Sequence, residues 1–328
     1  MIKCKKEKSW KIIVSFLAIR FALEKGMMSN MKEKVKVYFT NKITPESLVK
    51  IYQAVGYNLK GNVGVKISTG EPGGNNYLKP ELIKNIVEYL NGTIVENCTA
   101  YGGLRQNLQD HLKCVEDHGF TKIANVDILD SEGEFAIPTK EGSKHLKEDI
   151  VGSHLENYDS ILMLSHFKGH AMGGFGGALK NMSIGIASTK GKLNIHSAGA
   201  KNQEQSHVWS HLPEQDDFLE SMAEACSAVI EYYKKRGGIV YINVINNLSV
   251  DCDCDSHPEA PCMKDIGIVA SLDPVAIDRA SLDLIYKSND PGRDHFLERV
   301  ETRHGAHTIE HAVNLGLGTT FYEFINLD

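Results

Sequence analysis

The densest set of reactive side chains in the sequence lies between Ser249 and Gly267, in the stretch SVDCDCDSHPEAPCMKDIG. It contains three of the seven cysteines, several carboxylates and a histidine. If the backbone here is extended, successive side chains alternate, so Cys252 and Cys254 point to one side and Asp253 to the other. Thiolates bind zinc, copper(I) or iron–sulfur centres, whereas carboxylates bind calcium, magnesium or manganese. The side that faces inward therefore decides which metal this stretch binds.

The spacing of the acidic and cysteine residues limits the kinds of metal site that this stretch can form. Its D-x-D-x-D opening is that of a calcium loop, but Ser256 replaces the required glycine and Cys262 replaces the bidentate glutamate. Cys252, Cys254 and Cys262 supply three soft ligands, one fewer than structural zinc sites and cysteine-bound iron–sulfur clusters use. A fourth ligand would be His257, one of the aspartates such as Asp253, or a histidine from another loop, His166 or His170. The alternative is a reduced acidic loop that binds no metal.

A second reactive stretch, SHFKGHAMGGFGGALKN, begins at Ser165. His166, Lys168 and His170 occupy alternate positions and share one face if a strand extends this far. The residues that follow are the glycines Gly173, Gly174, Gly176 and Gly177, and then Lys180. These glycines lead into a predicted helix whose free N–H groups favour an anion. We predict that His166 or His170 acts as an acid or base, while Lys168 and the glycine-loop amides bind a small carboxylate or phosphate. The alternative is a tight glycine turn with exposed histidines.

Short β-rich runs alternate with amphipathic helical runs from Val35 onwards, which predicts a layered α/β fold with a largely parallel or mixed sheet. Ligands bind outside the carboxyl ends of strands in such sheets. Both reactive stretches follow strongly apolar predicted strands, so we expect their two loops to face one cleft. Residues 32–328 form the predicted α/β domain, and the polar residues 132–152 would separate lobes at 32–152 and 153–328.

Composition argues against several classes of protein. A formal net charge of -6 and a pI of about 6.2 argue against nucleic-acid binding, which needs a basic face. Residues 1–31 contain lysines and then an apolar run that is too short to span a bilayer. We expect a disordered extension or a mis-assigned start there, with an uncleaved surface anchor as the alternative. The odd number of cysteines and the C-D-C spacing favour a reducing compartment, the cytoplasm.

Three segments, LSHFKGH, GGFGGALKNMSIGIAS, and CDC followed by DIGIVASLDPVAIDRASLDLIY, resemble the domain-of-unknown-function 362 family. Members of that family are sometimes joined to ferredoxin-type iron–sulfur modules. The resemblance covers most of residues 34–324 and implies an α/β protein with an iron–sulfur or other metal role. The CDC positions of the family match Cys252 and Cys254, and its acidic DIG position matches Asp265, whereas Cys262 is outside the pattern. This chain has no C-x-x-C-x-x-C segment, which argues against a four-iron cluster.

A vaguer similarity is to enzymes of the lactate-racemase type, which use a nickel pincer nucleotide. It consists of a histidine loop, a glycine-rich turn and a lysine, here Lys180.

The sequence therefore predicts a metal- or iron–sulfur-binding protein, with a redox-linked role as one option and a site composed of the two loops. Its ligands would be Cys252 and Cys254, assisted by Asp253, Asp265 or a loop histidine. Its partner would be a small anionic ligand or a redox partner. The first alternative is a metal-dependent enzyme, with zinc or nickel, that acts on a small carboxylate or phosphate in the manner of a racemase or isomerase. The second alternative is an interaction module that uses the loops as a docking surface.

Overall fold

The computed structural model describes residues 34–328. The extension predicted at residues 1–31, with its alternative as a surface anchor, lies outside these residues. Within the described part of the chain, no helix is both long and apolar enough to cross a membrane.

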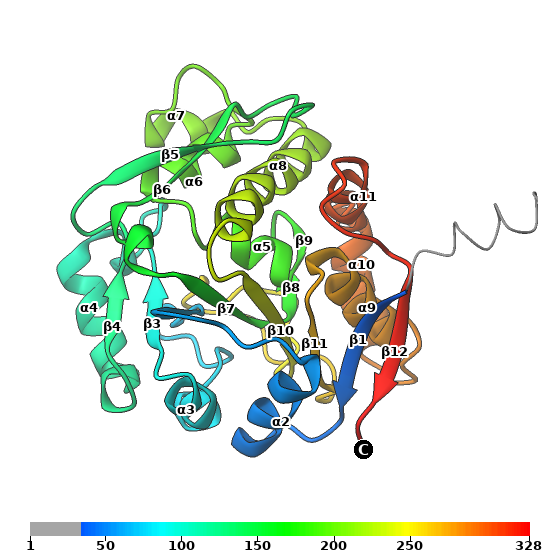
Figure 1. The fold of residues 1–328 in the computed structure, drawn as a ribbon. Helices are drawn as coiled ribbons and strands as arrows, with labels where there is room; N and C mark the ends of the chain where they lie inside the picture. The colour runs from blue at the N-terminus through cyan, green and yellow to red at the C-terminus, as the bar shows by residue number, and fades with distance from the viewer. Residues whose placement is uncertain (1–33) are drawn as a thin grey trace, which may run out of the picture. The chain divides into compact units, whose positions relative to one another are not determined.

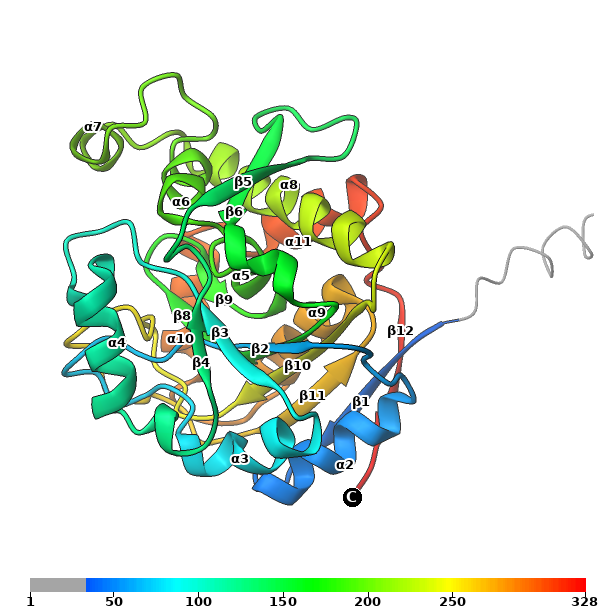
Figure 2. The same ribbon diagram turned by 60° about the vertical axis from the view of Figure 1, so that its left-hand side comes forward.

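An eight-stranded sheet forms the centre of the fold (Figures 1 and 2). Its strands lie in the order β12-β1-β11-β10-β7-β2-β3-β4. Their bounds are β1 Val35–Thr40, β2 Val63–Lys66, β3 Thr93–Glu96, β4 Val126–Ile128, β7 Ser160–His166, β10 Ile239–Ile245, β11 Gly267–Ser271 and β12 Tyr322–Asn326. Neighbouring strands are parallel, except that β11 runs antiparallel to both β1 and β10. The predicted α/β class with a largely parallel sheet is confirmed.

Strand β7 shows how the sequence specifies a sheet that is covered on both sides. All seven of its residues are buried. Ile161 and Met163 belong to the apolar core on one face, and Leu162 and Leu164 belong to the core on the other face. Side chains alternate along a strand, so an uninterrupted apolar run supplies both faces at once.

Helices lie over both faces of the sheet (Figures 1 and 2). The longer helices are α2 Pro45–Val55, α3 Pro80–Tyr89, α4 Leu108–Asp117, α8 Gln215–Lys234, α9 Pro274–Tyr286, α10 Arg293–Thr302 and α11 Ala306–Asn314. The shorter ones are α5 Ala178–Ser183, α6 Thr189–His196 and α7 Gln205–Ser210, with 3₁₀ turns η1 Leu104–Gln106, η2 Phe120–Lys122 and η3 Ser153–Asn157. Helices α2 and α3 pack on one face, whereas α5, α8 and α9 pack on the other.

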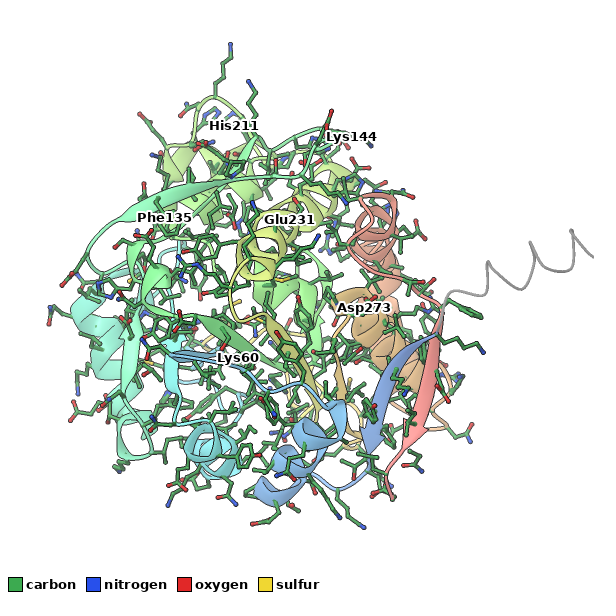
Figure 3. All side chains as sticks on the ribbon, in the orientation of Figure 1. Lys60, Phe135, Lys144, His211, Glu231 and Asp273 are labelled. Carbon is green, nitrogen blue, oxygen red and sulfur yellow. The ribbon has the colours of Figure 1, made fainter. Side chains whose placement is uncertain are left out.

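Two helices whose first residue is proline are preceded by a residue whose side chain caps the helix. The Thr44 hydroxyl accepts from the N–H of Ser47 at the start of α2, where Pro45 is the first helical residue. Asp273, labelled in Figure 3, accepts from the first free N–H groups of α9. Such caps satisfy donors that have no partner within the helix, so they fix where each helix begins.

Two small hairpins project from the central sheet. The polar residues 132–152 contain β5 Glu134–Pro138 and β6 Glu148–Gly152, which pair antiparallel. The second hairpin pairs β8 Lys168–His170 with β9 Gly174–Gly176. Strands from both predicted lobes, 32–152 and 153–328, form the one central sheet, because β2 pairs with β7.

Candidate metal centre and anion pocket

Four neighbouring parallel strands, β10, β7, β2 and β3, end at the same edge of the sheet. The C-D-C loop follows β10, and the histidine- and glycine-rich loop follows β7. A third loop, after β2, joins them, because the N–H of Glu71 donates to the Asp253 carbonyl oxygen at 2.8 Å. The loops therefore meet outside the carboxyl ends of the strands, where ligands bind in open α/β sheets.

The β8–β9 hairpin lies directly against the cysteine loop. The N–H of Gly169 donates to the Ser249 carbonyl oxygen at 2.8 Å. A Cβ atom on Gly169 would overlap the backbone of Val250. The close approach of the two backbones thus requires glycine at this position.

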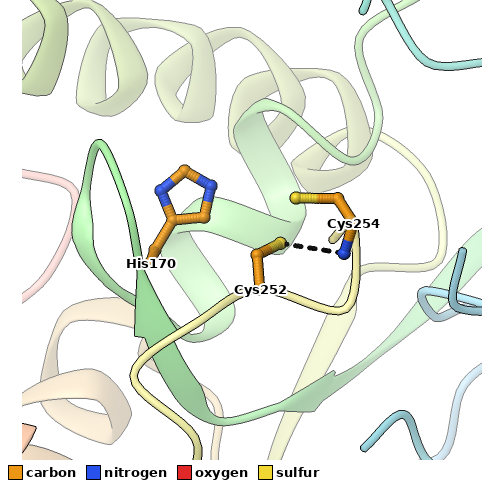
Figure 4. Close-up of side chains that lie close together, drawn as sticks. All are labelled: His170, Cys252 and Cys254. Atoms are coloured by element: carbon orange, nitrogen blue, oxygen red, sulfur yellow. Dashed lines mark hydrogen bonds between the residues drawn. The ribbon is translucent and has the colours of Figure 1, made fainter. Parts of the chain in front are cut away.

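The sulfurs of Cys252 and Cys254 lie beside a nitrogen of His170, and the three atoms are all within 4.8 Å of one another (Figure 4). The N–H of Cys254 donates to the Cys252 sulfur at 3.3 Å, and the Lys180 ammonium lies 3.6 Å from that sulfur. A hydrogen bond from the Cys254 thiol, with help from Lys180 and His170, holds the pKa of Cys252 well below its ordinary value despite burial. The same bond, together with burial, raises the pKa of Cys254. The pair therefore carries a thiolate on Cys252 and a thiol on Cys254.

His170 contributes a hydrogen to this pair. Burial, and then the charge of Lys180, lowers the pKa of His170, so its ring is neutral. The N–H groups of Met172 and Gly173 point at its Nδ1 at 3.2 and 2.8 Å, so Nδ1 is an acceptor and the ring hydrogen is on Nε2. A histidine that binds a metal through Nε2 needs the opposite arrangement, with Nδ1–H facing an acceptor. In this arrangement His170 donates towards the Cys252 thiolate rather than binding a metal.

The side chain of Asp253 forms a separate buried ion network. Its carboxylate lies 2.8 Å from Nδ1 of His166 and 3.1 Å from the ammonium of Lys168. Burial works to raise the pKa of Asp253, but these two positive groups hold it below its usual value. The other ring nitrogen of His166, Nε2, lies 2.7 Å from the Asn246 carbonyl oxygen, which can only accept. Both nitrogens of His166 therefore face oxygen atoms of the protein.

The glycine-rich turn leads into α5, whose first N–H groups are occupied. The Asp278 carboxylate accepts from Ala178 N at 2.7 Å and from Leu179 N at 2.9 Å. A Cβ atom on Gly177 would overlap this carboxylate. The start of α5 is thus capped by a protein side chain that lies about 100 residues further along the chain.

A pocket lies between these loops and the ends of β2 and β3. Its empty volume, including the part open to solvent, is about 590 Å³. Its charged lining residues are Lys66, Glu96, Arg105, Lys168, Lys180 and Lys192, and Cys254 lies on its wall. Arg105 is neutralised within the protein, because Nε contacts Glu71 and Nη1 contacts Glu96, each at 2.8 Å. The pocket therefore has an excess of positive charge and adjoins the cysteine pair.

The model of a domain of unknown function, DUF362, matches residues 63–283. The chain belongs to the DUF362 family. The resemblance predicted from the sequence is therefore confirmed. A search of curated proteins finds no match to this DUF362 chain.

Solved structures similar to this DUF362 chain include the lactate racemase apoprotein from Thermoanaerobacterium thermosaccharolyticum. It is 15% identical with a TM-score of 0.44, and the match covers 77% of this chain and 57% of that one. Another is a Thermotoga maritima protein, 15% identical with a TM-score of 0.40, for which the match covers 82% of this chain and 58% of that one. The matches thus span less than two thirds of either protein.

Three of the predicted metal ligands of the DUF362 chain, Cys262, Asp265 and Asp253, lie outside the cysteine–histidine group. The thiol of Cys262 donates to the Leu248 carbonyl oxygen at 3.2 Å. The carboxylate of Asp265 accepts from the N–H of Asn247 at 2.9 Å. Asp253, as described, faces His166 and Lys168. Among the described residues, the group placed closely enough to hold a metal is His170, Cys252 and Cys254, and the tautomer of His170 leaves the two sulfurs as its ligands.

Sequence reasoning missed the pocket lysines Lys66 and Lys192. Lys66 is the last residue of β2 and is 1% exposed. A charged residue at the end of an apolar strand was an available signal, because burying an ammonium group is costly unless it is paired, and unpaired buried charges are concentrated at functional sites. Lys192 lies within α6 and is also buried, but nothing in the local sequence of this helix distinguishes it from a surface lysine.

Proposed function

We propose that the protein binds a soft metal ion through the sulfurs of Cys252 and Cys254. The observation that carries this proposal is the buried pair of adjacent sulfurs, one of them held as a thiolate. Thiolates select soft ions, and a preformed thiolate lowers the cost of deprotonating the site.

Two cysteines leave open coordination positions on the ion, as in catalytic rather than structural sites. Cys254 lies on the wall of the cationic pocket, so an anion bound there could complete the coordination. A cluster with four cysteine ligands is less well supported, because Cys262 lies outside the group that could hold a metal. His170 would stabilise the Cys252 sulfur from outside the coordination sphere.

Metal titration of anaerobically purified, chelator-treated protein tests the proposal. With Co²⁺ as the probe, we expect about one ion per chain and a sulfur-to-cobalt charge-transfer band. Cys252→Ser and Cys254→Ser should each weaken binding by about 10-fold or more, because each removes a ligand. Binding should release the proton held by Cys254.

Cys262→Ser is the matched control, since it removes a sulfur outside the group. We expect this variant to bind cobalt as the wild type does. Unchanged binding in Cys252→Ser, or loss of binding in Cys262→Ser, would refute the assignment. Iron with acid-labile sulfide in the untreated protein would instead favour an iron–sulfur cluster.

The pocket favours a second function, an enzyme that acts on a small carboxylate or phosphate next to the metal. Its positive lining supports an anionic substrate. Lys66 fits proton transfer better than His166, because both nitrogens of His166 are engaged. Burial lowers the pKa of Lys66 to about 7, which suits a group that exchanges protons near neutral pH. A racemase or isomerase reaction, which moves a proton, is consistent with such a group.

A further inference from the structure

We infer that Lys66, Lys180 and Lys192 together bind a compact anion with two negative charges, such as a phosphate or a small dicarboxylate. The inference deepens the second function proposed above, because it specifies the class of substrate, and it does not require that a metal be bound. The three lysines line the same pocket and come from the end of β2, from α5 and from α6.

Each of these ammonium groups has hydrogens without an acceptor among the described residues. The Nζ atom of Lys66 donates to the Ile67 carbonyl oxygen at 2.6 Å and to Asn181 at 3.2 Å. Lys192 donates to the Ala187 carbonyl oxygen, and the contact of Lys180 is with the Cys252 sulfur. An ammonium group has three hydrogens, so one remains on Lys66 and two remain on each of the others. Lys66 and Lys192 are buried, and buried donors of this kind require an acceptor.

The charge balance of the pocket also requires an anion. The lining contains five cations, of which Arg105 is paired with Glu71 and Glu96, and Lys168 is paired with Asp253. Lys180 faces the Cys252 thiolate, whereas Lys66 and Lys192 form no ion pair with a carboxylate in the part of the chain that the structure describes. A ligand with one negative charge would leave one of these two lysines uncompensated, whereas a dianion would offset both.

A hydroxyl group in the pocket wall also supports an anionic ligand. Thr99 lines the pocket, and its Oγ1 is buried without a hydrogen-bond partner among the described residues. A hydroxyl can donate to an anionic oxygen.

The two deepest lysines make the binding dependent on pH. Burial lowers the pKa of Lys66 to about 7 and that of Lys192 to about 8. The charged or titratable groups that face them are Glu96, Arg105, Lys180, Asp130, Cys98 and Asp149. A bound anion favours the charged form of both lysines and raises their pKa values. Binding near pH 8 should therefore take up protons, and it should weaken at higher pH, where the free lysines are neutral.

Calorimetric titration of the full chain after chelator treatment tests the inference at pH 7.5. The probes are inorganic phosphate and malonate as dianions, with acetate and chloride as monoanions at matched ionic strength. We expect one dianion per chain, bound about 10-fold or more tightly than acetate. Preference for phosphate over malonate, or the reverse, would identify the source of the two charges.

Lys66→Met and Lys192→Met should each weaken dianion binding by about 10-fold or more, since each loses a charge-assisted hydrogen bond. Lys84→Met, on the exposed side of α3, is the matched control and should bind as the wild type does. If acetate binds as tightly as phosphate, the dianion inference fails although an enzyme of small anions remains supported. If no probe binds while cobalt binds normally, the inference and the second function fail, and the metal proposal survives.

A measurement on the wild-type protein tests the inference even if the lysine variants fail to fold. Titrations at pH 8 in buffers with different ionisation enthalpies report the protons taken up on binding. We expect proton uptake, and an affinity that falls by about 10-fold between pH 7.5 and 9.5. Binding without proton uptake would place the anion away from Lys66 and Lys192 and would overturn the inference.

Discussion

At the scale of single residues, the cysteines differ sharply in the surroundings of their sulfurs. Burial raises the pKa of Cys98 to about 12 and that of Cys114 to about 11. Burial also raises the pKa of Cys226. Cys252 is also buried, but the hydrogen bond from Cys254 lowers its pKa instead. Reactivity of these thiols at neutral pH should thus be concentrated on Cys252.

Replacing His170 should weaken the Cys252 thiolate in the metal-free protein. We expect His170→Ala to raise the apparent pKa of Cys252 by about one unit or more, because a hydrogen bond to a charged group contributes about 1.5–3 kcal/mol. The measurement is the pH dependence of thiolate absorbance near 240 nm, taken as the difference from Cys252→Ser. The half-buried His207, which stacks on His211 outside the site, offers a matched control, His207→Ala, which should leave the curve unchanged. A curve for His170→Ala that coincides with wild type would show that the ring does not donate to this sulfur.

Residue types at the site could be read from the sequence, but their partners could not. The pairing of His166 with Asp253 joins positions 87 residues apart, and the capping of α5 by Asp278 spans about 100 residues. Local patterns carry no information about such contacts. The extended backbone expected at Cys252 and Cys254 does not occur, because these residues form a turn in which the N–H of Asp255 donates to the Cys252 carbonyl oxygen at 3.0 Å.

At the scale of elements, the β8–β9 hairpin positions the cysteine loop through backbone contacts. Gly169→Ala should push this loop away from the hairpin, because the new Cβ would overlap the backbone of Val250. We expect a loss of stability of about 2 kcal/mol or more and cobalt binding weakened by about 10-fold. Denaturant unfolding and metal titration measure the two effects separately.

Gly102→Ala is a suitable comparison for this variant. Gly102 has open space where a Cβ would lie, and its backbone is not in the left-handed region. It should retain both the stability and the cobalt affinity of the wild type. Equal behaviour of the two alanine variants would mean that the contact at Gly169 does not position the loop.

Most elements could be predicted because their signals are local. Apolar strands and proline-led helix starts such as Thr44–Pro45 depend on a few adjacent residues. The direction of β11 could not be predicted in this way. It runs antiparallel between β1 and β10, and that placement depends on how the whole chain crosses the sheet.

At the scale of the whole molecule, the two ends of the described chain are joined in the sheet. Strand β1 pairs in parallel with β12, and the Asp328 carboxylate accepts from Thr40 Oγ1 and Asn41 N, each at 2.7 Å. Deleting residues 322–328 should therefore lower the melting temperature of the entire domain by about 5 °C or more, because one side of β1 loses its partner. Calorimetry should show a single transition at the lower temperature.

The deletion should leave the cysteine pair intact well below that transition, since β12 and the site lie at different parts of the sheet. Thiolate absorbance at low temperature provides the check. An unchanged melting temperature would show that β12 contributes little to the sheet.

The pairing of β1 also has a consequence for synthesis on the ribosome. Both neighbours of this strand, β11 and β12, lie more than 200 residues later in the chain, so β1 emerges long before either one exists. An apolar strand that waits with unpaired backbone groups is prone to associate with other chains. We expect the yield of native protein to depend on chaperones that bind the nascent chain, and to fall more steeply with expression temperature than the stability of the finished protein would suggest.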